Sequence, residues 1–207
     1  MTARRLWLVS TVLAASAVAW ALVVAQTRGM PGTGVWPYEL LWIAMTVAMM
    51  LPPATPMLLL VDRLSRAAVP LFALGYLLIW VGFGLVAYLV GRLVSWNDVG
   101  VLLVAIGAYQ LLPFRHACLR RCRNPLAFLR AHADHGPLRT GIAHGGVCIG
   151  CCAGLMVLLL GVGAMSVAWM GAIAGVILAE KLLPGSERLA VPSAVGLIAT
   201  GAWIGLA

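Results

Sequence analysis

The amino-acid sequence predicts an all-α membrane protein, a polytopic bundle of about seven transmembrane helices. Hydrophobic residues make up 63% of the 207 residues and charged residues only 10%, whereas soluble globular proteins carry about 25% charged residues. Apolar stretches long enough to cross a hydrocarbon core of about 30 Å follow one another along the chain. The basic residues gather in alternate connections, which is typical of a multi-pass membrane protein.

Seven apolar stretches are the predicted spans. They cover residues 6–26, 36–61, 67–92, 99–113, 141–163, 165–183 and 189–206. The first exceeds the apolar length of a signal peptide, about 7 to 15 residues, so we interpret it as a retained anchor. Because the fourth is short and the turn after the fifth is tight, six spans with a re-entrant segment remain the alternative. Residues 1–207 then form a single membrane domain, and 114–140 is a basic cytoplasmic Cys/His loop.

The distribution of basic residues predicts a cytoplasmic N-terminus. Lys and Arg in short loops stay on the cytoplasmic side. With this orientation 12 of the 14 basic residues are cytoplasmic, and only Arg28 and Arg92 lie outside. The net charge of +8 is therefore explained by topology and requires no nucleic acid.

Three thiols interrupt the fifth stretch. His144, Cys148, Cys152 and Met156 follow one another at steps of four, so they share one helical face, and Cys151 adjoins them. A single buried Cys is most often a small apolar filler. Three thiols beside an imidazole and a thioether instead indicate soft-metal ligands or thiol chemistry. On the opposite face, a row of glycines predicts close helix packing: Gly146, Gly150 and Gly154.

The second stretch adds thioethers next to prolines. It contains Met45, Met49 and Met50, followed by Pro52, Pro53 and Pro56. Proline removes a backbone donor, and a broken helix is a recurring device at transport sites, with a packed kink as the alternative. Along regular helices Met49 and Cys152 reach similar depths, roughly 16 to 18 Å from the cytoplasmic end. Thiolate and thioether ligands together select Cu(I).

The loop 114–140 carries the other two cysteines. Cys118 and Cys122 share a helical face, and Pro125 is expected to end or kink that helix. Surrounding arginines are expected to lower the pKa of both thiols; the alternative is an amphipathic interfacial helix. Glu180 and Lys181 close the sixth stretch, where an ion pair or snorkelling is the ordinary explanation.

Four segments together resemble a bacterial family of predicted metal-binding integral membrane proteins, domain of unknown function 2182, whose members are labelled copper chaperone-like. The segments are WIAMTVAMMLPPATPM, AYQLLPFRHACLRRCRNPLAFL, GGVCIGCCAGLM and AWMGAIAGVILAEKLLPG. The resemblance implies a metal role for all five cysteines and for the methionines of the second stretch. It also implies a multi-pass protein of the bacterial inner (plasma) membrane.

The leading hypothesis is a non-enzymatic protein that binds a soft metal, Cu(I), and carries or delivers it. Zinc or another soft metal remains open, as do the direction of movement and the oligomeric state. A thiol–disulfide oxidoreductase is the enzymatic alternative, because Cys148 and Cys151 have the spacing of a redox pair. An accessory or assembly subunit of a membrane metalloenzyme is the third. Expected partners are the lipid bilayer, a metal ion, other membrane subunits or a soluble metallochaperone, and a second copy of the chain.

Overall fold

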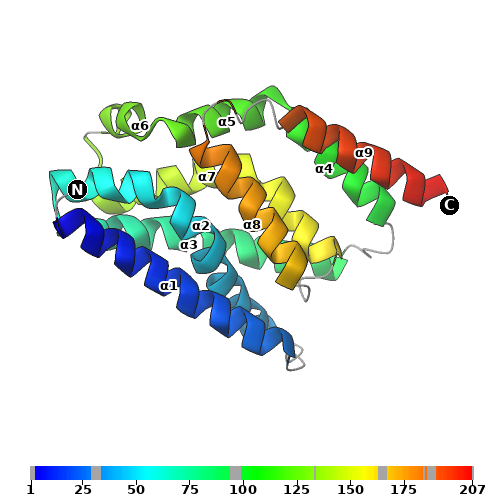
Figure 1. The fold of residues 1–207 in the computed structure, drawn as a ribbon, viewed down its shortest axis with the longest axis horizontal. Helices are drawn as coiled ribbons and strands as arrows, with labels where there is room; N and C mark the ends of the chain where they lie inside the picture. Colours follow the sequence, from blue (N-terminus) through cyan, green and yellow to red (C-terminus); the bar gives the residue numbers. More distant parts are fainter. Residues whose placement is uncertain are drawn as a thin grey trace. The chain divides into compact units, whose positions relative to one another are not determined.

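The fold is all-α, as the sequence predicts (Figure 1). A computed structural model describes residues 3–28, 34–93, 99–132, 134–162, 167–183, 185 and 190–206, and no strand occurs among these residues. The helices are α1 (Ala3–Arg28), α2 (Val35–Leu64), α3 (Ala68–Leu93), α4 (Val99–Leu111), α5 (Pro113–Arg123), α6 (Pro125–Ala131), α7 (Pro137–Val162), α8 (Val167–Leu182) and α9 (Ala190–Leu206).

Among the described residues the structure has four candidate spans, or five, fewer than the seven predicted. In the described part of the chain α1, α2, α3 and α7 are each long and apolar enough to cross a membrane, which is consistent with a membrane protein. Helix α4 passes that test only together with α5, from which it is bent by 61°. Helices α8 and α9 have 16 and 17 residues, or about 24 to 26 Å at 1.5 Å per residue, less than the roughly 30 Å core. The predicted starts at 165 and 189 lie outside the described residues.

The chain divides into two compact units, which are described separately. Unit 1 comprises Met1–Val86 and Asn124–Gly146, with α1, α2, most of α3, α6 and the beginning of α7. Helix α1 packs on α2, where Arg4 pairs with Asp62 at 2.9 Å. The single membrane domain stays a prediction.

Glycines allow α3 and the beginning of α7 to approach closely within unit 1. A Cβ atom added at Gly75 would collide with the Leu138 carbonyl oxygen, and one at Gly141 with the Phe72 carbonyl oxygen. Small residues permit this backbone approach in apolar helix pairs. The first turns of α7 are thereby fixed against α3.

Helix α2 continues through its prolines without interruption from Val35 to Leu64. Of the two interpretations of these prolines, the broken helix is therefore wrong. Hydroxyl groups donate to nearby carbonyl oxygens of the helix: Ser16 to Val47 at 3.3 Å and Tyr76 to Met50 at 3.3 Å. These hydrogen bonds join α2 to α1 and α3 beside the proline segment.

Unit 2 comprises Ala87–Arg123 and Val147–Ala207, with α4, α5, the rest of α7, α8 and α9. Helices α4 and α9 lie side by side (Figure 1). A Cβ atom at Gly100 would come within 2.7 Å of the Gly201 carbonyl oxygen. Helix α5 ends at Arg123, as the position of Pro125 predicts, and Asn124 caps the following helix by accepting a hydrogen bond from the Ala127 amide at 3.2 Å.

Candidate metal centre

Helix α7 presents three thiols on one side. Cys148, Cys151 and Cys152 are three and four residues apart, which places them on adjoining positions of a helical surface. All three are buried, with exposed fractions of 1%, 2% and 2%. The helix continues unbroken through this segment, so the thiols are carried on a regular backbone.

Helix α5 carries the other two thiols to α7. Cys118 is buried and Cys122 is half-buried. Cys118 packs on Gly150, where an added Cβ atom would lie 2.7 Å from the Cys118 sulfur. The glycine face predicted for α7 is thus used at Gly150 and also at Gly154, which contacts the ring of Tyr109.

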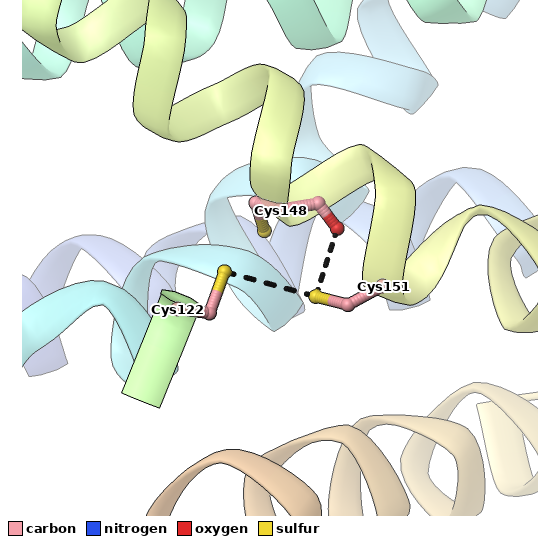
Figure 2. Close-up of side chains that lie close together, drawn as sticks. All are labelled: Cys122, Cys148 and Cys151. Atoms are coloured by element: carbon pink, nitrogen blue, oxygen red, sulfur yellow. Dashed lines mark hydrogen bonds between the residues drawn. The ribbon is translucent and has the colours of Figure 1, made fainter. Parts of the chain in front are cut away.

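Three thiols from the two helices converge (Figure 2). The Sγ atoms of Cys122, Cys148 and Cys151 all lie within 4.8 Å of one another. The Cys151 thiol is 3.7 Å from the Cys122 sulfur and 3.1 Å from the Cys148 carbonyl oxygen. Cys152 adjoins the group, with its sulfur 3.5 Å from that of Cys151. We call Cys122, Cys148 and Cys151 the thiol triad.

The spacing of the thiol triad suits a metal ion bound by three sulfurs. Metal–sulfur bonds of about 2.3 Å in a trigonal arrangement place the sulfurs about 4 Å apart. The observed separations, up to 4.8 Å, require only small side-chain movements to reach that geometry. Thiolates are soft ligands that favour Cu(I) and Zn(II) over hard cations.

A lysine contacts the thiol triad from α8. The Lys181 Nζ atom donates a hydrogen bond to the Cys148 sulfur at 2.8 Å. An ammonium group next to a thiol is a typical feature of reactive or metal-binding cysteine environments. The sequence interpretation, which treated Lys181 as a boundary residue, missed this contact.

A buried ion pair lies beside the same thiols. Arg115 on α5 donates to Glu180 on α8 at 2.5 Å and to the Cys151 carbonyl oxygen at 3.2 Å. The arginine side chain is fully buried and that of the glutamate is 3% exposed. At the other end of α5, Arg123 donates to the Leu183 carbonyl oxygen at 2.7 Å. Helix α5, with Cys122, is therefore fastened to α8 near both of its ends.

The thiols of α5 do not behave as their basic surroundings suggest. This helix is itself polar and carries four arginines of the predicted loop 114–140. Burial raises the pKa of Cys118, and the Arg121 guanidinium offsets only part of that rise. A hydrogen bond with the Cys148 sulfur raises the pKa of Cys122. The expectation that arginines lower both pKa values is wrong, and a metal bound at these thiols must displace their protons.

The remaining predicted ligands lie in other surroundings. The His144 ring is enclosed by aromatic side chains of unit 1, with ring centroids 5.8 Å from Phe72, 5.9 Å from Tyr76 and 5.1 Å from Phe128. The methionines of α2 are buried in unit 1, and Met156 is buried on α7 in unit 2; their ligand roles stay predictions. The methionines of α2 are Met45, Met49 and Met50.

Helical spacing could not have identified the charged neighbours of the thiol triad. Lys181 is 33 residues from Cys148 along the chain, and Arg115 is 65 residues from Glu180. The adjacent charges Glu180 and Lys181 at the end of an otherwise apolar stretch were the available signal, since charges inside membrane segments are rare and usually paired. The sequence interpretation expected Glu180 to be explained by Lys181, whereas its short ion pair is with Arg115.

The extent of the sequence match to known proteins settles the family. No curated protein and no solved structure matches the chain. Residues 39–204 match the family described as "PpoB2: Copper chaperone", a segment that includes all five cysteines and Lys181. This confirms the resemblance to copper chaperone-like membrane proteins. The chain belongs to the PpoB2 copper chaperone family.

Proposed function

We propose that the protein is a membrane-embedded carrier that binds Cu(I) at the thiol triad and delivers it to an acceptor. The observation that carries this proposal is the convergence of Cys122, Cys148 and Cys151 from two helices to within 4.8 Å. Family membership supports copper as the metal, and soft thiolate ligands suit Cu(I). The protein is not an enzyme in this proposal, because the ion is passed on unchanged.

Differences in burial suggest how the ion enters and leaves. Cys122 is half-buried, whereas Cys148 and Cys151 are almost fully buried. An incoming or outgoing ion therefore meets Cys122 first and exchanges its ligands one at a time with those of a partner. The neighbouring Cys118 and Cys152 are further ligands of this path.

The other predicted soft ligands remain candidate ligands in our proposal, each within its own unit. They are His144 and Met156 on α7 and the methionines Met45, Met49 and Met50 on α2. The protein resides in the bacterial inner membrane, and its partner is a soluble metallochaperone or a subunit of a membrane metalloenzyme. Binding at the thiol triad is tested independently of these additions.

Copper content of the purified protein tests the proposal. Wild-type protein purified without oxygen is expected to carry about one Cu(I) per chain, with X-ray absorption reporting sulfur ligands. Cys122→Ser and the triple variant Cys148→Ser, Cys151→Ser, Cys152→Ser are each expected to lose it. Met170→Leu is the control, because this buried methionine of α8 is not a proposed ligand and the change conserves volume. Equal copper in wild type and triple variant would sink the proposal.

A thiol–disulfide oxidoreductase is the second candidate. The 3.7 Å distance between the Cys122 and Cys151 sulfurs favours it, as does the two-residue spacing of Cys148 and Cys151. In this reaction the two thiols reduce a partner's disulfide, transfer two electrons and two protons to it, and form their own disulfide. If this candidate is right, differential alkylation of thiols in cells is expected to detect a disulfide between Cys122 and Cys151. Full reduction of both residues under oxidant would count against this candidate.

A further inference from the structure

Lys181 is unusual in both chemistry and position. It is the only lysine of the chain, since the other 13 basic residues are arginines. Its ammonium nitrogen lies 2.8 Å from the sulfur of Cys148, and the side chain is half-buried on α8. Neither the copper content nor the ligand set of the proposed function requires a cation at this position.

A thiol triad that has bound a metal ion carries a negative charge, which a nearby cation would stabilise. Three thiolates and Cu(I) carry a total charge of −2, whereas three thiolates and a divalent ion carry −1. Two of the three sulfurs come from cysteines no more than 2% exposed, and charge removed from water is costly unless it is paired. The buried Arg115 already pairs with Glu180. Lys181 is a cation in hydrogen-bond contact with a sulfur of the triad.

We propose that Lys181 supplies the counter-charge that makes the thiol triad selective for monovalent soft cations, Cu(I) above Zn(II). An ammonium group attracts the complex of charge −2 about twice as strongly as the complex of charge −1 at the same distance. Both ions displace the same number of thiol protons when all three sulfurs bind, so deprotonation cancels in the comparison. A charged ammonium has no lone pair to offer, so Lys181 acts on the site without being a ligand.

Affinities of matched variants for ions of different charge test this role. Cu(I) and Ag(I) are the monovalent probes and Zn(II) is the divalent probe, each measured by competition with a chromophoric chelator. Lys181→Met is expected to weaken Cu(I) and Ag(I) binding about 100-fold and Zn(II) binding about 10-fold, as order-of-magnitude values for one lost charge contact. Lys181→Arg keeps the charge, so its ratio of Cu(I) to Zn(II) affinity is expected to be close to that of the wild type.

A charge control and a chemical control complete the experiment. Arg120→Gln removes a cation from the exposed side of α5, where solvent and salt screen it, so the ratio of Cu(I) to Zn(II) affinity should stay within about threefold. If Lys181→Met does not fold, acetylation of the folded wild type removes the same charge, and amidination of the amine keeps it. Acetylation should then lower the ratio and amidination should not.

Two outcomes overturn the proposal. One is an equal loss of affinity for all three ions in Lys181→Met, which would indicate a purely structural contact. The other is a Lys181→Arg variant whose ion ratio matches that of Lys181→Met. The proposal rests on the proposed copper function. Wild type that binds no Cu(I) refutes that function itself. Wild type that binds Cu(I), with a Lys181→Met variant that keeps the wild-type ratio of Cu(I) to Zn(II) affinity, refutes only the role of Lys181.

Discussion

Arg115 and Glu180 form an ion pair that is almost completely removed from solvent. Replacing Glu180 with Leu leaves the arginine charge buried without its counter-charge. Breaking a buried pair in this way typically costs about 3 to 5 kcal/mol. We therefore expect Glu180→Leu to lower the stability of unit 2 by that amount, measured by denaturation in detergent.

The paired variant separates charge from packing. Arg115→Met combined with Glu180→Leu removes both charges and is expected to be more stable than Glu180→Leu alone. The pair of Arg4 and Asp62 is the comparison, because the Arg4 side chain is 53% exposed whereas that of Asp62 is 7% exposed. Arg4→Met should cost less than Glu180→Leu, because only one side of this pair is removed from water. A double variant no more stable than Glu180→Leu would show that the ion pair is not the source of the loss.

Residue spacing predicted the thiols well and their charged neighbours poorly. Cys148, Cys151 and Cys152 lie on one helix, so the helical period alone groups them. Cys122 and Lys181 reach the same place only through the packing of α5 and α8 against α7, which no local pattern encodes. His144 shares the helical step of four, yet its ring is surrounded by aromatic side chains that come from distant segments.

Contact between α3 and α7 is the most constrained helix crossing of unit 1. A Cβ atom at Gly75 would collide with the Leu138 carbonyl oxygen and lie 3.1 Å from the Ile142 amide nitrogen. Both are backbone atoms, so relief requires a helix to move and no side chain can rotate away. We expect Gly75→Ala to destabilise the protein by about 1 to 3 kcal/mol, seen as a lower denaturation midpoint in detergent.

Gly82 on the same helix provides the matched control. A Cβ atom there would meet no atom within 4 Å among the described residues. Because alanine favours helix over glycine by about 1 kcal/mol, Gly82→Ala is expected to be neutral or slightly stabilising. Equal destabilisation by both substitutions would contradict a packing origin and indicate a general requirement for glycine in α3.

Each predicted apolar stretch contains a helix, but among the described residues fewer helices are long enough to be candidate spans. The bounds of α1, α2 and α3 agree with the predicted stretches within a few residues. The described parts of α8 and α9 are apolar but short, and α4 is bent by 61° from α5. Hydropathy measures the composition of a run, whereas spanning depends on the length of unbroken helix. The prolines of α2 misled in the opposite direction, because one interpretation of them was a broken helix, whereas α2 is continuous from Val35 to Leu64.

Charge distribution over the whole molecule predicts its orientation. Arg63 lies in the last turn of α2 and Arg66 in the short connection to α3, and basic residues in and beside short loops remain cytoplasmic. Alkaline phosphatase fused after Arg66 is therefore expected to be inactive, and the same enzyme fused after Arg28 to be active outside the membrane. Green fluorescent protein at the same positions should give the opposite pattern. Activity after Arg66 but not after Arg28 would invert the proposed orientation.

Cys122, the half-buried thiol of the triad, can test both the orientation of the protein in the membrane and the metal site. The other four cysteines are at most 7% exposed, so a membrane-impermeant maleimide is expected to label about one thiol per chain in inside-out vesicles and none in right-side-out vesicles. Prior loading with Cu(I) should protect that thiol, because a metal-bound sulfur is no longer nucleophilic. Cys122→Ser should abolish the labelling. Labelling that persists in Cys122→Ser, or that Cu(I) does not reduce, would separate the exposed thiol from the metal site and remove Cys122 from the path of the ion.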